Sequence, residues 1–254
     1  MSATRIPAYD EIGTGYARRR RVDPRLAAPL HSALGGARRV LNVGAGTGSY
    51  EPSDRLVVAL EPSSVMIRQR CSSLGRVIQG QAESMPFATR SFDAVMAVLT
   101  AHHWSDRQAG FAELRRIAQR RVVLTFDPQV HNRMWLMDYL PEIRDLRSAR
   151  GLTIDEVVYG VGGGTVTTLP VAHDCPDGMT AAFWRRPEAY LDPEVRLGSS
   201  ALRELDSIPL ERGLARLDRD LRTGAWARRY GHLLELDEFD CGLRLVVGQD
   251  PLER

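Results

Sequence analysis

The ten residues from Arg39 to Gly48 constrain the fold of this chain more than any other stretch. They read RVLNVGAGTG, an apolar run that ends in glycines at alternate positions, beginning with Gly44 and Gly46. Apolar runs of this kind fit strands that are buried on both faces of a parallel sheet. Glycine lets the backbone turn sharply and approach a ligand without a Cβ clash. The stretch therefore predicts a buried strand and a tight turn that lies against a ligand.

A second strand-like run follows at Leu56–Leu60 and ends directly before Glu61. In a doubly wound α/β sheet, an acidic residue at this distance from the glycine turn accepts hydrogen bonds from the ribose of a bound nucleotide. The dinucleotide fingerprint GxGxxG needs a third glycine where this chain has Ser49. The spacing therefore disfavours a nicotinamide dehydrogenase.

The GxGxG pattern and its acidic partner resemble motif I and the following acid of class I S-adenosylmethionine-dependent methyltransferases. The resemblance continues in order across residues 39–142, through NVGAGTGSYEP, VVALEPSSVMIRQR, QAESMPF, SFDAVMAVLTAHHW, ELRRIAQRRVVLTFDP and YLPE. These segments are similar to the type 11 family of small-molecule methyltransferases. The flanking YDEIGTGYARRRRVDPR and PVAHDCPDGMTAAFWRRPEAYLDP resemble actinobacterial members of that family.

Apolar periodicity predicts strands near residues 39–44, 55–60, 76–80, 93–98 and 121–126, with helical patterns between them. Alternating strands and helices favour a parallel sheet with right-handed crossovers and a ligand at the carboxyl ends of the strands. Two further candidates, 165–171 and 242–247, would complete the antiparallel edge of a class I methyltransferase. The expected fold is therefore a Rossmann-like α/β fold with a seven-stranded, mostly parallel sheet.

We expect a single methyltransferase domain over residues 1–254. Its predicted parts are a helical N-terminal cap (1–34), a cofactor-binding core (35–127), a helical lid and acceptor-binding region (128–240, including strand 165–171) and a final strand (241–249). Within that region, 128–163 and 174–240 are expected to be helical insertions over the pocket. The GVGGGT run at 160–165 fits either a flexible hinge or a plain connection into the next strand.

Composition excludes several classes of function. The net charge is only +2, which disfavours nucleic acid as a partner because tracking phosphates needs a clustered positive face. No apolar run approaches the ~20 residues of a membrane span, and the N-terminus lacks the apolar core of a signal peptide. We therefore expect a cytoplasmic protein without a membrane partner.

Three widely spaced cysteines without CxxC indicate free thiols, and no HExxH, P-loop or GxSxG motif occurs.

The resemblance implies S-adenosyl-L-methionine as cofactor, S-adenosyl-L-homocysteine as product, and no metal. The backbone around Asn42, Gly44, Ala45 and Gly46 would line the methionine part. Amides at the start of a helix after the turn would bind its carboxylate. Glu61 would take the ribose.

The resemblance also places Pro62, Ser63 and Met66 beside the adenine. Ala82 and Glu83 would lie on its far side, and Leu99 is a further expected cofactor contact. For Met66, a place in the core of a helix is an equally good interpretation. Gln81 stands where many relatives carry Asp, which puts the usual contact with the adenine amino group in doubt.

Tyr16 and Arg20 lie four residues apart and would share one face of a helix. The resemblance implies that they close over the cofactor, with Arg20 pairing with its carboxylate. The competing interpretation is that Arg18–Arg21 is a solvated basic run.

The expected chemistry is an in-line displacement at a methyl carbon, which depends mainly on alignment of the reactants in a water-poor pocket. His103, in the HHW sequence after the fourth strand, can accept a proton at neutral pH. The same sequence can instead only shape the pocket. His102 is expected to be buried and hydrogen-bonded.

Further downstream, His173 and the acidic residues after it can offer a His–Asp pair to the acceptor. The alternative for Asp177 is the N-cap of the helix that begins at GMTAAFW. Four aromatic residues of the proposed lids fit either an acceptor pocket or the lid core, namely Trp135, Tyr139, Trp184 and Tyr190.

These patterns predict a methyltransferase that acts on a small organic acceptor, by analogy in secondary metabolism. The alternative is a protein that binds S-adenosylmethionine without transferring methyl, as a regulator or as a cyclase or eliminase on the same fold. The sequence sets neither the acceptor atom nor the oligomeric state.

Overall fold

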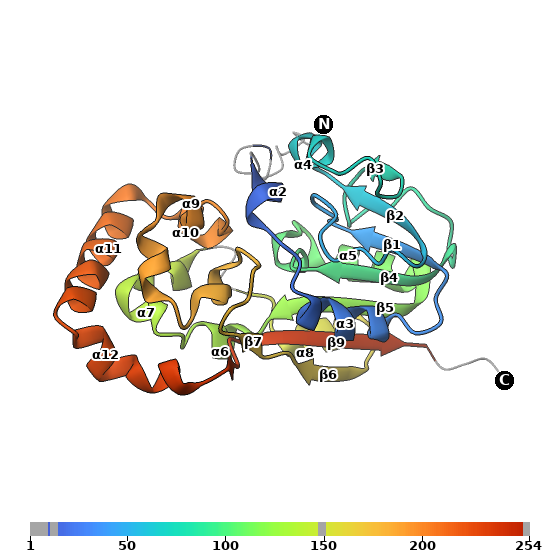
Figure 1. The fold of residues 1–254 in the computed structure, drawn as a ribbon. Coiled ribbons are helices and arrows are strands. Elements are labelled where there is room, and N and C mark those ends of the chain that lie inside the picture. Colours follow the sequence, from blue (N-terminus) through green and yellow to red (C-terminus); the bar gives the residue numbers. More distant parts are fainter. Residues whose placement is uncertain (1–9, 11–14, 147–150, 251–254) are drawn as a thin grey trace.

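The computed structural model describes residues 10, 15–146 and 151–250 (Figure 1). Its centre is a seven-stranded sheet in the order β3-β2-β1-β4-β5-β9-β6. In that order the strands are Val77–Gln79, Leu56–Glu61, Arg39–Val43, Phe92–Val98, Ala118–Phe126, Leu243–Gln249 and Thr165–Thr168. The first five are parallel, and β9 is antiparallel to both β5 and β6. This arrangement confirms the predicted Rossmann-like sheet.

Helices cover both faces of the sheet, which explains why its central strands are apolar runs rather than alternating patterns. One face packs against α3 (Pro24–Ala33), whose Leu26 and Leu30 are buried one turn apart. The other face packs against α5 (Arg107–Ile117) and α8 (Ile154–Gly160). Helix α8 therefore covers the sheet. The prediction that 128–163 is an insertion over the pocket is wrong for the residues of this helix.

Residues 44–55, which join β1 to β2, contain no helix. Their sequence, GAGTGSYEPSDR, is rich in glycine and includes proline and serine, which are poor helix formers. The expected helix after the glycine turn, and the backbone amides at its start, are therefore absent from this connection.

The expected strand 165–171 is divided between two sheets. Strand β6 ends at Thr168, and β7 (Val171–Ala172) pairs with β8 (Glu238–Phe239) in a separate two-stranded sheet. In the glycine run before β6, a Cβ on Gly163 would meet nothing within 4 Å, but a Cβ on Gly164 would lie 2.0 Å from the carbonyl oxygen of Val247. This favours the plain connection over a hinge.

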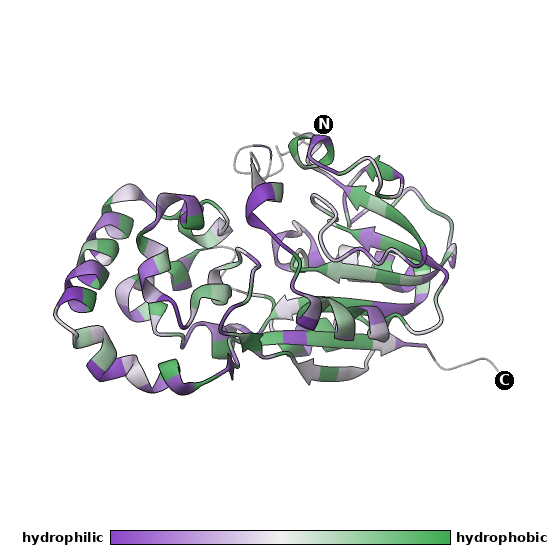
Figure 2. Ribbon diagram, viewed as in Figure 1, coloured by the Kyte–Doolittle hydropathy of each residue, from purple (hydrophilic) through white to green (hydrophobic). Residues whose placement is uncertain are grey.

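The helical region lies beside the ends of β4 and β5 (Figure 1). It comprises α6 (Pro128–His131), α7 (Leu136–Tyr139), η2 (Pro141–Asp145), η3 (Thr180–Phe183), η4 (Pro187–Leu191), α9 (Pro193–Arg196), α10 (Ser200–Glu204), α11 (Ser207–Arg222), α12 (Ala225–Tyr230) and η5 (Gly231–Glu235). We call these elements the lid. Hydrophilic and hydrophobic residues alternate along α11, as in an amphipathic helix with one face toward its neighbours (Figure 2).

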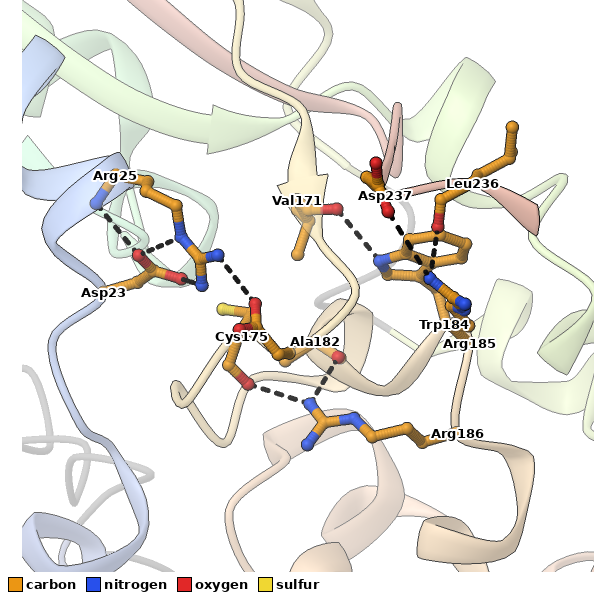
Figure 3. A network of polar contacts seen from close by, with 11 residues as sticks. Asp23, Arg25, Val171, Cys175, Ala182, Trp184, Arg185, Arg186, Leu236 and Asp237 are labelled. Carbon is orange, nitrogen blue, oxygen red and sulfur yellow. Dashed lines mark hydrogen bonds and ion pairs between the residues drawn. The ribbon is translucent and has the colours of Figure 1, made fainter. Parts of the chain in front are cut away.

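The aromatic residues of the lid form its own core. The ring of Trp135 lies 5.5 Å from that of Tyr190 and 5.3 Å from that of Trp226, centroid to centroid. The Trp135 indole N–H donates to the carbonyl of Trp184 at 2.7 Å. The Trp184 indole N–H in turn donates to the carbonyl of Val171 at 2.9 Å (Figure 3). Buried indoles with satisfied N–H groups are core residues, which favours the core interpretation over an acceptor pocket.

Helix α3 is tied to the segment after β7 by a group of polar contacts (Figure 3). Asp23 caps α3 by accepting from the Arg25 amide at 2.9 Å, and the Arg25 guanidinium pairs with both Asp23 and Asp174.

The cysteines are free, with Cys71 exposed and the other two buried. Within the described ranges, no helix has the length and apolar character needed to cross a membrane.

Candidate active site

The glycine turn lies between the carboxyl ends of β2 and β4. Gly44 and Gly46 have φ values of 63° and 53°, in the left-handed region that side chains disfavour. A Cβ on Gly44 would lie 2.0 Å from the Thr100 hydroxyl oxygen, so the turn presses against the loop after β4. The amides of Gly44 and the buried Ala45 donate to the carbonyl of Leu60 at 2.8 and 3.1 Å. These contacts bring the ends of three strands together.

Glu61, the last residue of β2, is 4% exposed. Its Oε2 accepts from the Gly46 amide at 2.7 Å and its Oε1 from the Ser63 amide at 2.8 Å. Burial raises the pKa of Glu61, and the hydrogen bonds from the two backbone amides lower it. An ionised carboxylate can accept about four hydrogen bonds. The two hydrogen bonds from backbone amides therefore leave room for further donors.

A buried ion pair lies where a helix was expected to follow the turn. Nη2 of Arg70 donates to both carboxylate oxygens of Glu51, at 3.0 and 2.9 Å, and their side chains are only 4% and 2% exposed. Nη1 of Arg70 also donates to the carbonyl of Gly46 at 3.4 Å. Sequence patterns did not single out either residue. Their only local signal was the poor helix-forming sequence after the glycines.

Asn42 extends this group of contacts to β1. Its Nδ2 donates to Glu51 at 3.0 Å. Its Oδ1 is buried and has no hydrogen-bond partner within the part of the chain that the structure describes. Because an unsatisfied buried acceptor is costly, this oxygen marks a place for a donor from a ligand.

The segment after β2 begins helix α4 (Ser64–Arg68). The hydroxyl of Ser63 accepts from the Met66 amide at 3.2 Å and donates to Asp10 at 2.6 Å. Met66 is buried, and a Cβ on Gly46 would lie 3.2 Å from its terminal methyl group. Met66 therefore packs under the turn, and its expected contact with the adenine stays a prediction. The carbonyl of Pro62 accepts from Gln79 at 3.1 Å.

The loop after β3 is held in place by polar contacts. Ala82 is buried. Glu83 accepts from the amide and hydroxyl of Ser105 at 2.7 and 2.8 Å and from the Asp106 amide at 3.3 Å. Its carboxylate fastens this loop to the start of α5. Gln81 is exposed.

Tyr16 and Arg20 lie together at helix α2 (Tyr16–Arg19), as predicted from their spacing. The guanidinium of Arg20 lies 5.2 Å from the centre of the Tyr16 ring and donates to its hydroxyl. Arg20 also forms an ion pair with Asp177, and its side chain is 11% exposed. The interpretation of Arg20 as part of a solvated basic run is therefore wrong.

Asp177 joins this ion pair to the connection after the glycine turn. It is buried and accepts from the Tyr50 hydroxyl at 2.7 Å and from the Met179 amide at 3.1 Å. Helix η3 begins later, at Thr180, so Asp177 is not the N-cap that its sequence suggested. Burial and the neighbouring carboxylate raise the pKa of Tyr50, which keeps its hydroxyl protonated.

A cavity of about 100 Å³ lies between Arg20, the ends of β4 and β5, and the lid. Leu99, directly after β4, lines it with a φ of 52°, a conformation that is strained for a branched side chain. A water molecule needs on the order of 10 to 15 Å³ of such volume, so the cavity can hold an organic group of several atoms.

The histidine that reaches this cavity from the HHW sequence is His102. It lines the cavity with half-buried side-chain surface, and burial lowers its pKa well below 6.5, so it is neutral at pH 7. The ring of His103 lies 4.0 Å from that of His102. Among the described residues, neither His103 nor His173 lines the cavity. The amide of His173 instead donates to the carbonyl of Asp237 at 2.9 Å, beside the β7–β8 pair.

His131 and Asn132 also line the cavity, from the end of α6. Neither was singled out from the sequence. Their only signal was their place shortly after the carboxyl end of β5, where ligand-binding residues of such sheets gather. Within the described ranges, no group of three or more His, Cys, Asp or Glu side chains could hold a metal ion.

Comparison with known proteins agrees with this geometry. Residues 41–126 match the family model described as a methyltransferase domain. The crystal structure of a candidate methyltransferase from an antibiotic biosynthesis pathway of Anabaena variabilis is 32% identical, with a TM-score of 0.85, and the match covers 91% of this chain and 99% of that one. The [4+2]-cyclase SpnF shares the fold at a TM-score of 0.54 and 14% identity, over 96% of this chain and 95% of that one.

Among curated proteins, the uncharacterised YafE of Escherichia coli is 51% identical over 125 residues, which is 45% of this chain and 58% of YafE. The 2-methyl-6-phytyl-1,4-hydroquinone methyltransferase 2 of rice is 26% identical over 115 residues, 41% of this chain. The matched regions cover between 33% and 58% of the lengths of these curated relatives.

Proposed function

The chain belongs to the class I S-adenosylmethionine-dependent methyltransferases, and we propose that it transfers a methyl group to a small organic acceptor held in the cavity under the lid. The observation that carries the proposal is the continuity between the glycine turn and that cavity. Arg20 lines the cavity, its partner Asp177 binds Tyr50, and Tyr50 belongs to the connection that leaves the turn.

The residues around the turn fit the proposed cofactor. The buried Oδ1 of Asn42 suits the ammonium group of a methionine moiety, and Glu61 suits two ribose hydroxyls. Arg20 suits the carboxylate of the methionine moiety. The absence of a helix between β1 and β2 supports this role, because no helix start supplies backbone amides for that carboxylate there. When bound, S-adenosylmethionine supplies an electrophilic methyl group on a positively charged sulfur.

The protein's own contribution is then mainly alignment and the exclusion of water. Leu99 is fixed at the end of β4 by a hydrogen bond from its amide to the carbonyl of Leu124 at 2.8 Å, and it lines the cavity. Correct alignment of two bound reactants corresponds to effective molarities of ~10⁵ M or more.

The small cavity supports a small-molecule acceptor. The pathway named for the Anabaena variabilis relative supports secondary metabolism as its setting. A cytoplasmic location and the exclusion of nucleic acid and membrane partners stay predictions from composition.

The first test is calorimetric titration of the protein with S-adenosylhomocysteine, with NAD as a control ligand. We expect binding of S-adenosylhomocysteine only. Glu61→Ala should weaken it by ~1 to 3 kcal/mol through loss of hydrogen bonds to a charged group. The matched control is Glu211→Ala, at an exposed position of α11, which should leave affinity unchanged.

Absence of binding to the wild-type protein, or preference for NAD, would contradict the proposal. Binding without turnover of any acceptor would favour the alternative of a protein that does not transfer methyl.

A further inference from the structure

The cavity holds a histidine whose tautomer is fixed by the fold. Nδ1 of His131 lies 3.1 Å from the carbonyl oxygen of Cys241. A carbonyl oxygen can only accept a hydrogen bond, so Nδ1 carries the hydrogen. In a neutral imidazole the other nitrogen, Nε2, then has the free lone pair. Because His131 also lines the cavity and its Nδ1 is bound to the backbone, Nε2 is the ring nitrogen that is left for a ligand.

The contact depends on an unusually close approach of two segments. Gly242 has a φ of 90°, and a Cβ there would lie 2.8 Å from the amide nitrogen of His131 and 2.9 Å from the carbonyl oxygen of Asp127. The amide of Asp127 donates back to the carbonyl of Gly242 at 2.7 Å. Glycine at this position therefore lets the Cys241 carbonyl reach the imidazole and holds it there.

The surroundings favour a neutral imidazole. Burial lowers the pKa of His131 below 6.5, and the Phe126 ring lies 4.5 Å from its own ring. The other titratable groups that line the cavity are His102 and Arg20, and Arg20 is paired with Asp177. No Asp or Glu occurs in the described lining of the cavity. A cationic ligand would therefore lack a counter-charge.

Asn132 supplies a second hydrogen-bond acceptor. It lines the same cavity, and its buried Oδ1 has no partner among residues 10, 15–146 and 151–250. The remaining walls combine apolar side chains, such as Leu99, Phe126 and Ile143, with hydroxyl groups of threonine and serine residues. Two acceptors in a cavity without a carboxylate in its described lining match a neutral compound that donates hydrogen bonds.

We infer that the methyl acceptor is a neutral alcohol or phenol and that Nε2 of His131 takes its hydroxyl proton. This inference rests on the proposed function. The acceptor oxygen forms a bond to the methyl carbon while the bond between that carbon and sulfur breaks. The electron pair of the broken bond stays on the sulfur and neutralises its positive charge. The hydroxyl proton passes to Nε2, and the resulting imidazolium later releases it to water. Asn132 Oδ1 binds a second donor group of the same compound.

The first test needs no cofactor. Long-range ¹H–¹⁵N spectra of the full chain report the protonated nitrogen of each of its six histidines, and loss of a signal in His131→Asn assigns His131. We expect the Nδ1–H tautomer and titration below pH 6.5. An Nε2–H tautomer, or titration above that pH, would overturn the inference.

The second test uses phenol as the probe and toluene as a ligand of matched shape without the hydroxyl, both in the presence of S-adenosylhomocysteine. Phenol should move the Nε2 resonance of His131, and toluene should not. Equal shifts with both would overturn the inference. A chain that keeps the expected tautomer but does not bind S-adenosylhomocysteine would instead overturn the proposed function, so the two failures are distinguishable.

The third test measures turnover. Asn at position 131 keeps a donor near the place of Nδ1 but removes the base. With phenol, catechol and benzyl alcohol as probes, His131→Asn should lower methyl transfer by roughly 100-fold or more and leave the affinity for S-adenosylhomocysteine within twofold. Transfer at the wild-type rate, or preference for aniline over phenol, would overturn the inference.

Discussion

The buried Glu51–Arg70 pair gives the sharpest prediction about the glycine turn. Glu51→Gln leaves the side chain nearly the same size and removes its charge, so the Arg70 guanidinium, which is 4% exposed, stays buried without a counter-charge. Breaking a buried ion pair in this way costs ~3 to 5 kcal/mol. With an m-value of about 3 kcal/mol per M of urea, the unfolding midpoint should fall by roughly 1 to 2 M.

The assay is urea unfolding followed by circular dichroism, with titration of S-adenosylhomocysteine on the same variants. The matched control is Asp218→Asn, because its ion pair with Arg222 on α11 is 35% and 75% exposed. Exposed pairs of this spacing contribute about 0.3 to 0.5 kcal/mol. Glu51→Leu combined with Arg70→Met should recover part of the loss. The recovery is incomplete because Nδ2 of Asn42 also loses its acceptor.

A loss below about 1 kcal/mol in Glu51→Gln would refute this reasoning, since it would mean that water or another side chain compensates the buried charge. A full recovery in the double variant would show that Asn42 does not depend on Glu51.

Three further predictions concern the glycine turn, the two buried histidines and the free cysteines. Gly44→Ala should destabilise the fold by more than about 1 kcal/mol, measured by the same urea assay, because its Cβ would lie 2.0 Å from Thr100 Oγ1 at a φ of 63°; unchanged stability would contradict the tight turn. Burial lowers the pKa of His102 and His131 below 6.5, so the unfolded chain binds more protons and stability should fall as the pH drops below about 6.5; a flat profile in wild-type protein would contradict the burial. Cys71, as the exposed thiol, should react first with iodoacetamide in the native protein, and mass spectrometry showing equal labelling of all three cysteines would contradict the structure.

The sheet could be predicted because its signals are local. Each strand of the core is an apolar run bounded by polar or glycine-rich residues, and the antiparallel β9 was predicted within a few residues of its observed bounds. The helix after the glycine turn was predicted wrongly because the resemblance to the family outweighed the poor helix propensity of residues 44–55.

The candidate site was less predictable because its contacts are distant in sequence. Arg20 and Asp177 lie 157 residues apart, and His131 and Cys241 lie 110 apart. Spacing along a helix explains why Tyr16 and Arg20 meet, but no local pattern reports a partner on another segment. The choice between His102 and His103 likewise depends on which ring a short 3₁₀ helix turns toward the cavity.

The pairing of β7 with β8 has a consequence for how this protein can diversify. The two strands join Val171 to Phe239 and Ala172 to Glu238, so the chain between them starts and ends at one fixed point. The entropic cost of closing a long connection whose two ends are paired changes little with the length of that connection. Natural variation or grafting between these strands can therefore replace most of the lid as one unit, and the strand that ends in Glu61 and the strand that precedes Leu99 stay in place.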